Sequence, residues 1–336
     1  IIPSSSPVRL RLTNMEVSSL SREGYKTRTN KTVWVFTAVY FGLAAASFLC
    51  YWLAGMSAFD AINHAFSVTA TGGFSTRNMS IASYGSNLIN IITMVFMFLG
   101  SVHFGIIYMV FASRSLKPLN NPVLKFYVMT IVVASLLVSL SLKMSDGGFS
   151  WGDSFMTGIF QVISAISTTG FAISDNNTWP LFACIVTVLI TVPCAMAGST
   201  TGGVKSDRML LMFKTIGQQV KNSVHPSSIN QVHVGGHILN NNEIYPHIVF
   251  IGLSFITIAA SMALTILSGM DVQNSLASSI SCLSNVGPAL ESVGTLGNYN
   301  GVPVMAKVVF IVDMFLGRVE IYPVMAVVMM MFSGRK

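Results

Sequence analysis

The chain has 336 residues, of which 52% are hydrophobic and only 9% are charged. Because a soluble domain carries about 25% charged residues, this composition excludes a cytoplasmic globular enzyme and a disordered tail. It predicts an all-α integral membrane protein. The net charge of +7 does not indicate a nucleic-acid partner, because fifteen of the 19 Lys and Arg fall in four patches between long apolar segments. Such patches are typical of cytoplasmic loops, and they lie at 1–31, 114–125, 205–221 and 335–336.

Six apolar segments follow one another along the chain, each close to or above the ~20 residues that a helix needs to span a bilayer. The predicted spans are 33–54, 88–112, 126–142, 180–213 (interrupted), 246–267 and 303–332. A shorter, mixed stretch follows the first, third and fifth of them, at 57–75, 153–172 and 271–290. Each stretch opens near an acidic residue, as expected of a helix N-terminus. Each is too short to cross the membrane, and each then reaches a glycine: Gly72, Gly170 or Gly287.

The chain therefore divides into units of a span, a short helix, a glycine loop and a second span. We expect a basic cytoplasmic segment (1–31), three such units (32–113, 114–214 and 244–336) and a cytoplasmic loop (215–243). That loop contains VHVGGHIL, which is typical of a β-hairpin and whose two histidines are more simply strand residues than metal ligands. Because the basic patches lie between units, both termini are expected in the cytoplasm and the short helices on the outer side. Non-helical backbone at membrane depth has to line protein or a water-filled cavity, so the pattern predicts a central pore or an internal site.

The three glycine loops share a pattern of hydroxyl residue, any residue, β-branched residue and glycine. Glycine permits backbone angles that let an extended segment point successive carbonyl oxygens to one side. Rings of such carbonyls replace the hydration shell of a monovalent cation, and each short helix directs its negative C-terminal end to the same place. One such loop is simply a helix terminator, but three in equivalent positions predict an ion-selective filter. The candidate filter residues are Thr69, Ala70, Thr71, Gly72, Gly73, Ser167, Thr168, Thr169, Gly170, Phe171, Ser284, Asn285, Val286, Gly287 and Pro288.

Two further features lie inside predicted spans. The fourth span is interrupted by small or helix-breaking residues: Gly198, Ser199, Thr200, Thr201, Gly202 and Gly203. Their spacing is similar to that of a phosphate-binding loop, but Val204 separates the glycines from the lysine and an apolar span precedes them. Arg318 lies within the last span, where a charge costs at least about 2.5–3.5 kcal/mol and should face the interior. It either forms an ion pair with Asp313 or Glu320, or it places a positive charge in the pore.

Five motifs, in this order, resemble the membrane subunit of the Trk/Ktr/HKT superfamily of potassium transporters, most closely the bacterial Trk type. They are FDAINHAFSVTATGGFST, ISTTGFAISDNNTWPLF, AMAGSTTGGVKSDR, CLSNVGPALESVG and DMFLGRVEIYP, and the resemblance spans roughly 33–334. It implies four units of M1, pore helix and M2 around one pore, a homodimer in the cell inner membrane, and K⁺ as the transported ion. It implies no cofactor in this chain. It also implies a cytosolic nucleotide-binding regulatory subunit, for which 215–243 is a candidate contact.

The resemblance places Gly72, Gly170 and Gly287 in the second, third and fourth filter segments, and it makes the 198–203 loop with Arg318 the gate. A first filter segment is absent from the sequence. The chain is therefore expected to be part of a longer four-repeat transporter, or else to need another chain to complete its pore. An ion-coupled secondary transporter with broken helices is the alternative, but it requires inverted repeats, whereas the short helices here all lie on one side. No catalytic constellation favours a membrane-embedded enzyme.

Overall fold

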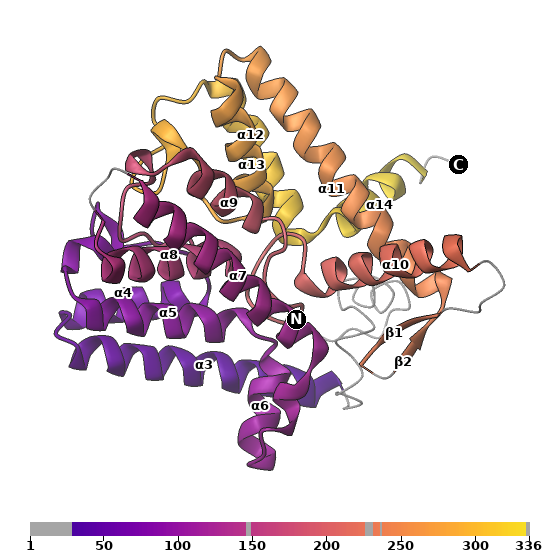
Figure 1. Cartoon of the computed structure of the whole chain (residues 1–336), viewed down its shortest axis with the longest axis horizontal. Helices are drawn as coiled ribbons and strands as arrows, with labels where there is room; N and C mark the ends of the chain where they lie inside the picture. The colour runs from indigo at the N-terminus through magenta and orange to yellow at the C-terminus, as the bar shows by residue number, and fades with distance from the viewer. Residues whose placement is uncertain (1–28, 146–148, 226–230, 236, 334–336) are drawn as a thin grey trace.

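The computed structural model is almost entirely helical (Figure 1), and it describes residues 29–145, 149–225, 231–235 and 237–333. The basic segment expected at 1–31 lies outside these residues except for its last three, and so does the patch at 335–336. The helices are α3 (Thr29–Leu53), α4 (Ala58–Thr69), α5 (Asn87–Ser101), α6 (Phe104–Ser113), α7 (Pro122–Met144), α8 (Trp151–Ile166), α9 (Leu181–Ile190), α10 (Ser206–Val224), α11 (Asn241–Leu267), α12 (Val272–Ser284), α13 (Val304–Val319) and α14 (Ile321–Ser333). Strands β1 (Val232–Val234) and β2 (His237–Leu239) pair antiparallel and lie beside α10 (Figure 1).

Three helices in the described part of the chain are long and apolar enough to cross a membrane, over Val33–Leu53, Pro122–Met144 and Asn241–Leu267. Each packs against the short helix that follows it: α3 against α4, α7 against α8, and α11 against α12. The short helices have 12, 16 and 13 residues. At 1.5 Å per residue they are shorter than the hydrocarbon core of a bilayer, so they end inside the fold.

The short helices begin at side-chain caps, which satisfy otherwise unpaired N–H groups of the first turn. Ser57 accepts from the backbone N–H of Asp60 at 3.1 Å, and the caps of α8 and α12 are Ser150 and Asp271. The Asp60 carboxylate in turn accepts hydrogen bonds from Thr76 at 2.5 Å and Arg77 at 3.0 Å. The hydrogen bond from Thr76, supported by Arg77, lowers the pKa of Asp60 from 3.8 to about 2.

The second helix of each unit is broken, and this corrects two of the predicted spans. The segment at 88–112 is the helix pair α5 and α6, bent by 98°. The segment at 303–332 is α13 and α14, separated at Glu320, whose φ is +68°. The expected interruption of 180–213 is present between α9 and α10, and α10 continues past the boundary expected at 214. The loop between α9 and α10 bonds to backbone groups at both other breaks: the N–H of Phe104 donates to Gly198 at 3.1 Å, and that of Gly203 donates to Gly317 at 3.3 Å.

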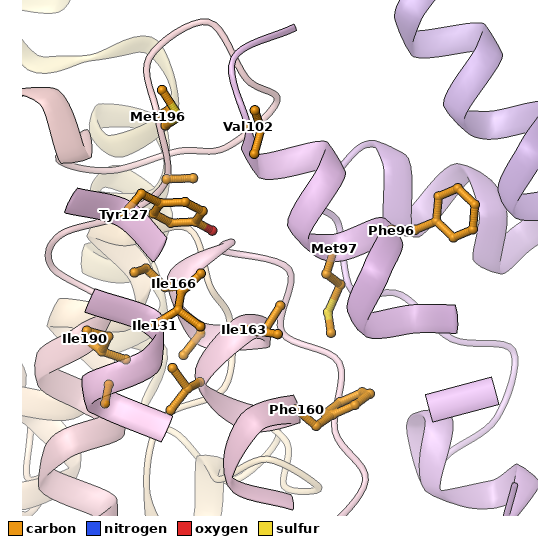
Figure 2. Close-up of a cluster of buried hydrophobic side chains, with 14 of the residues drawn as sticks. Phe96, Met97, Val102, Tyr127, Ile131, Phe160, Ile163, Ile166, Ile190 and Met196 are labelled. Atoms are coloured by element: carbon orange, nitrogen blue, oxygen red, sulfur yellow. The ribbon is translucent and has the colours of Figure 1, made fainter. Parts of the chain in front are cut away.

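The largest buried cluster joins the first two units (Figure 2). Met97 of α5 points toward α8, whereas Phe96 points to the opposite side of α5. Helix α7 contributes Tyr127, whose hydroxyl lies 2.7 Å from the Ser101 hydroxyl at the end of α5. The side chains labelled from α7, α8, α9 and the following loop are Tyr127, Ile131, Phe160, Ile163, Ile166, Ile190 and Met196. This packing fixes the end of α5 relative to the loop after α9, where the candidate site lies.

Candidate ion pathway and its closing loop

The backbone takes the same path at the end of α4, α8 and α12. Each helix is followed, within two residues, by a non-glycine residue of positive φ, and a glycine of positive φ comes two residues after that one. The residues and their φ values are Thr71 (51°), Thr168 (53°) and Asn285 (60°), then Gly73 (65°), Gly170 (84°) and Gly287 (100°). The glycine equivalent to Gly170 and Gly287 is therefore Gly73. The alignment expected on Gly72 is one residue out of register.

Hydrogen bonds support this register. The N–H of Thr71 donates to the carbonyl three residues earlier at 3.2 Å, and those of Thr168 and Asn285 do the same at 3.1 Å. Two serines hydrogen-bond to the segments that follow α8 and α12. Ser164 Oγ donates to the carbonyl of Phe171, and Ser281 Oγ donates to that of Pro288, both at 2.6 Å. Equivalent contacts at equivalent positions mean that these segments share one conformation. In this register Gly72 corresponds to Thr169 and Val286, which both carry side chains.

The filter segments pack directly on one another through their glycines. A Cβ on Gly73 would overlap the carbonyl of Thr169, whose carbon would lie at 2.9 Å. A Cβ on Gly170 would overlap the carbonyl oxygen of Val286 in the same way. A Cβ on Gly287 would meet no atom within 4 Å in the described residues. The segment after α4 therefore touches the one after α8, which in turn touches the one after α12, and within the described part of the chain nothing fills the space beside Gly287.

The 198–203 loop touches all three segments. The Thr200 hydroxyl donates to the carbonyl of Thr69 at 3.0 Å, and the N–H of Gly202 donates to the hydroxyl of Thr168 at 3.3 Å. A Cβ on Gly203 would lie only 3.0 Å from Cα of Ser284. The loop thus contacts residues at or just after the C-terminal ends of all three short helices.

Arg318 reaches this loop from the end of α13. Its Nη1 donates to the carbonyl of Thr200 at 2.7 Å, and the hydroxyl of Thr71 lies 3.2 Å from the same oxygen. The two acidic residues that sequence analysis offered as ion-pair partners are engaged elsewhere. Asp313 accepts from Ser261 at 2.6 Å. Glu320 is bound by Arg208 at 2.6 Å. The arrangement therefore places the positive charge of Arg318 on the loop.

Sequence analysis quoted the motif GGVKSDR but gave no role to its charged residues. Lys205 is only 8% exposed, and its ammonium group contacts the carbonyl and hydroxyl of Thr201 and lies 3.4 Å from the carbonyl of Gly202. Asp207 and Arg208 are buried beside it. The signal that could have identified them is three charges directly after an interrupted apolar span, since charges at membrane depth are costly and usually functional.

Comparisons with known proteins extend this description. The family model TrkH, described as a cation transport protein, matches residues 8–335. The Trk system potassium uptake protein TrkH of Salmonella typhimurium is 32% identical over 298 residues, which are 88% of this chain and 60% of that protein. TrkG of Escherichia coli is 30% identical over 308 residues, with coverage of 91% and 61%.

Among solved structures, the potassium transporter TrkH from Vibrio parahaemolyticus superposes with a TM-score of 0.84 at 31% identity. The match covers 92% of this chain and 66% of the other. The chain therefore spans about 60% of the length of the curated relatives that it matches.

Proposed function

We propose, since the chain belongs to the TrkH family of cation transport proteins, that it forms most of a potassium uptake pore in the cell inner membrane. The observation that carries the proposal is the succession of glycine contacts between filter segments, from Gly73 to Thr169 and from Gly170 to Val286. These two successive contacts support the proposal, because neighbouring segments of a carbonyl-lined filter lie side by side. The printed names of the relatives, potassium uptake proteins of the Trk system, point to the ion.

In this proposal the units 32–113, 114–214 and 244–336 are the second, third and fourth repeats of the pore. A further segment, from sequence outside this chain or from another chain, fits against the open side of Gly287. Carbonyl and hydroxyl oxygens of the candidate filter residues take the place of the K⁺ hydration shell. Flow is passive, and an inside-negative membrane potential favours entry.

The gate we propose is the 198–203 loop held by Arg318. The supporting contact is the hydrogen bond from the guanidinium to the Thr200 carbonyl. A positive charge at this place repels a cation in the path, and the loop that it binds lies against all three filter segments. Opening then requires Arg318 to leave Thr200 and the loop to move aside.

The regulatory partner we propose is a cytosolic nucleotide-binding subunit, and a second copy of the chain completes a homodimer. The candidate contact is the β1–β2 hairpin, where Ile238 is exposed. Deleting 232–239 should weaken binding of that subunit, as measured by pull-down of the purified membrane protein. A control variant, Lys117→Gln in the loop before α7, should keep full affinity. Full affinity in the deletion would exclude the hairpin as the contact.

Rubidium uptake tests the main proposal. Cells that lack their own potassium uptake systems would express either this chain or the same chain with a Trk-type first repeat fused in front. Uptake by the fusion alone would mean that a fourth segment in the same chain completes the filter. Uptake by the 336 residues alone would mean that another chain supplies it. If both proteins insert in the membrane and neither takes up rubidium, the proposed function is wrong.

A further inference from the structure

Two charged residues at the start of α10 hold the two ends of the gate loop. Lys205, the residue before the helix, places its ammonium group on the carbonyls of Thr201 and Gly202. Asp207, in the first turn, accepts a hydrogen bond from the backbone N–H of Ala197 at 3.2 Å. Both ends of the 198–203 loop are therefore attached to the same helical turn.

The next residue, Arg208, reaches the helix break that carries Arg318. Its Nη2 lies 2.6 Å from Oε2 of Glu320, the residue of positive φ between α13 and α14. Its guanidinium also lies 3.9 Å from the ring centre of Phe250 on α11, which fixes its direction. Because Glu320 follows Arg318 by two residues, the position of Arg208 sets the position of the backbone from which Arg318 extends.

Stability alone does not explain these charges. Lys205, Asp207, Arg208 and Glu320 are each at most 8% exposed. Replacing a buried ion pair with apolar residues is often neutral or stabilising, so buried charges indicate another role. The cluster is also incompletely satisfied: within the described ranges, one oxygen of Asp207 and one nitrogen of Arg208 are buried without a hydrogen-bond partner. A fully satisfied polar network rigidifies a core, and this network is not fully satisfied.

The middle of α10 contacts the hairpin. Lys214 donates to the carbonyl of His233 in β1 at 2.5 Å. Lys214 follows Arg208 by six residues, or about 9 Å along a helix that rises 1.5 Å per residue. This contact links the hairpin to the helix whose first turn holds the loop.

We propose that the turn 205–208 couples the position of α10 to the gate, an inference that rests on the proposed function of the loop and of Arg318. When α10 moves, Lys205 and Asp207 pull on both ends of the loop. The Arg208–Glu320 pair moves the break at the same time, and Arg318 leaves the Thr200 carbonyl. Arg208 and Glu320 are positioning residues in this scheme, because they act on the ion path only through Arg318.

A double substitution tests the coupling with no uncompensated buried charge. Arg208→Gln combined with Glu320→Gln replaces the ion pair with two amides. Energetic coupling between sites typically changes an equilibrium about 5- to 150-fold, so basal rubidium flux should rise by about tenfold. When Arg318 is already replaced by Gln, adding the double substitution should change rubidium flux by less than about twofold. Residues that act only through Arg318 have no further effect once Arg318 is absent. Lys221→Gln, in the last turn of α10, is the matched control and should leave flux unchanged.

Two results would overturn the coupling: unchanged flux in the double variant, or an equal change with and without Arg318. A second readout does not depend on conduction. With the four native cysteines replaced, Ser199→Cys reports the exposure of the loop to a water-soluble thiol reagent. The double variant should raise its labelling rate about tenfold, and an unchanged rate refutes the coupling even in a chain that conducts no ions. Absence of flux in the unsubstituted protein would refute the proposed function instead.

Discussion

The register of the candidate filter segment at 69–73 can be tested by two adjacent substitutions, Gly73→Ala and Gly72→Ala. Gly73 has a φ of +65°, where an alanine costs about 1–2 kcal/mol. Its Cβ would also push against the backbone carbonyl of Thr169, and overpacking of this kind costs about 1–3 kcal/mol. The two terms together come to about 2–5 kcal/mol. Much of this strain falls on a carbonyl that we assign to the ion path.

Gly72 is the matched control, because it lies outside the left-handed region. A Cβ there would meet the flexible side chain of Phe74 at 3.3 Å and the carbonyl oxygen of Ser67 at 3.7 Å, an ordinary van der Waals distance. The equivalent positions, Thr169 and Val286, already carry a Cβ. Since Gly→Ala at a compatible site stabilises by about 0.4–1 kcal/mol through the unfolded chain, Gly72→Ala should be close to neutral.

The assay is rubidium uptake with sodium as competitor, normalised to the amount of protein in the membrane. A barrier increase of about 1.4 kcal/mol lowers a rate tenfold. Gly73→Ala should therefore lose at least about tenfold in uptake, and Gly72→Ala should stay within about twofold. Gly170→Ala should behave like Gly73→Ala. Equal damage from the two neighbouring substitutions, or wild-type uptake in Gly73→Ala, would refute the register and the packing argument.

Three further predictions concern single residues. Arg318→Ala should raise basal rubidium flux. Lys307→Ala, nearer the other end of α13, is the control and should leave the flux unchanged. Equal flux in the two variants would show that Arg318 does not hold the gate closed. Gly317→Ala would press a Cβ against the carbonyl of Leu283 near the end of α12 and should lower the melting temperature of the purified protein. Gly252→Ala is the control, because a Cβ at this position would meet nothing within 4 Å in the described chain. It should raise the free energy of unfolding by up to about 1 kcal/mol. A higher melting temperature for Gly317→Ala than for Gly252→Ala would contradict this packing argument. The Asp60 carboxylate, with its pKa of about 2 against 3.8 unfolded, contributes stability that is present above pH 4 and lost as the pH falls towards 2. Asp60→Asn should therefore lower the free energy of unfolding at neutral pH, and lower it much less at pH 2. An equal decrease at both pH values would show that the charge of Asp60 is not the cause.

The helical membrane class and the three short helices could be predicted because composition and segment length decide them. A chain with 9% charge cannot cover a soluble surface, and a helix of 12 to 16 residues cannot span a bilayer. The register within the candidate filter segment at 69–73 could not be predicted. Gly72 and Gly73 are adjacent, either one completes the glycine pattern, and only the backbone conformation distinguishes them.

The breaks after α5 and in α13–α14 were missed because hydropathy does not detect them. Both segments are apolar on average, although Arg318 and Glu320 lie at the second break and Pro323 lies in the first turn of α14. A signal is present in the repeated tetrad Phe-Leu-Gly-x at 98–101 and 315–318, which ends each helix just before its break. The helices stop there because the loop after α9 supplies partners for freed backbone groups, at Phe104 and Gly317. Such partners are distant in the sequence, so no local pattern reveals them.

The space beside Gly287 can show whether a further segment completes the proposed pore. At Gly73 and Gly170 the next segment fills the space that a side chain would need, so glycine is required there for packing as well as for φ. Gly287 has the same φ sign, but nothing in the described residues fills its open side. Gly287→Ala should therefore cost only the left-handed strain, about 1–2 kcal/mol, wherever that side stays open. If a fourth segment occupies the place, the same substitution becomes as damaging to rubidium uptake as Gly170→Ala. Comparing these two variants in the chain alone and in the fusion with a first repeat shows directly which protein has a closed filter.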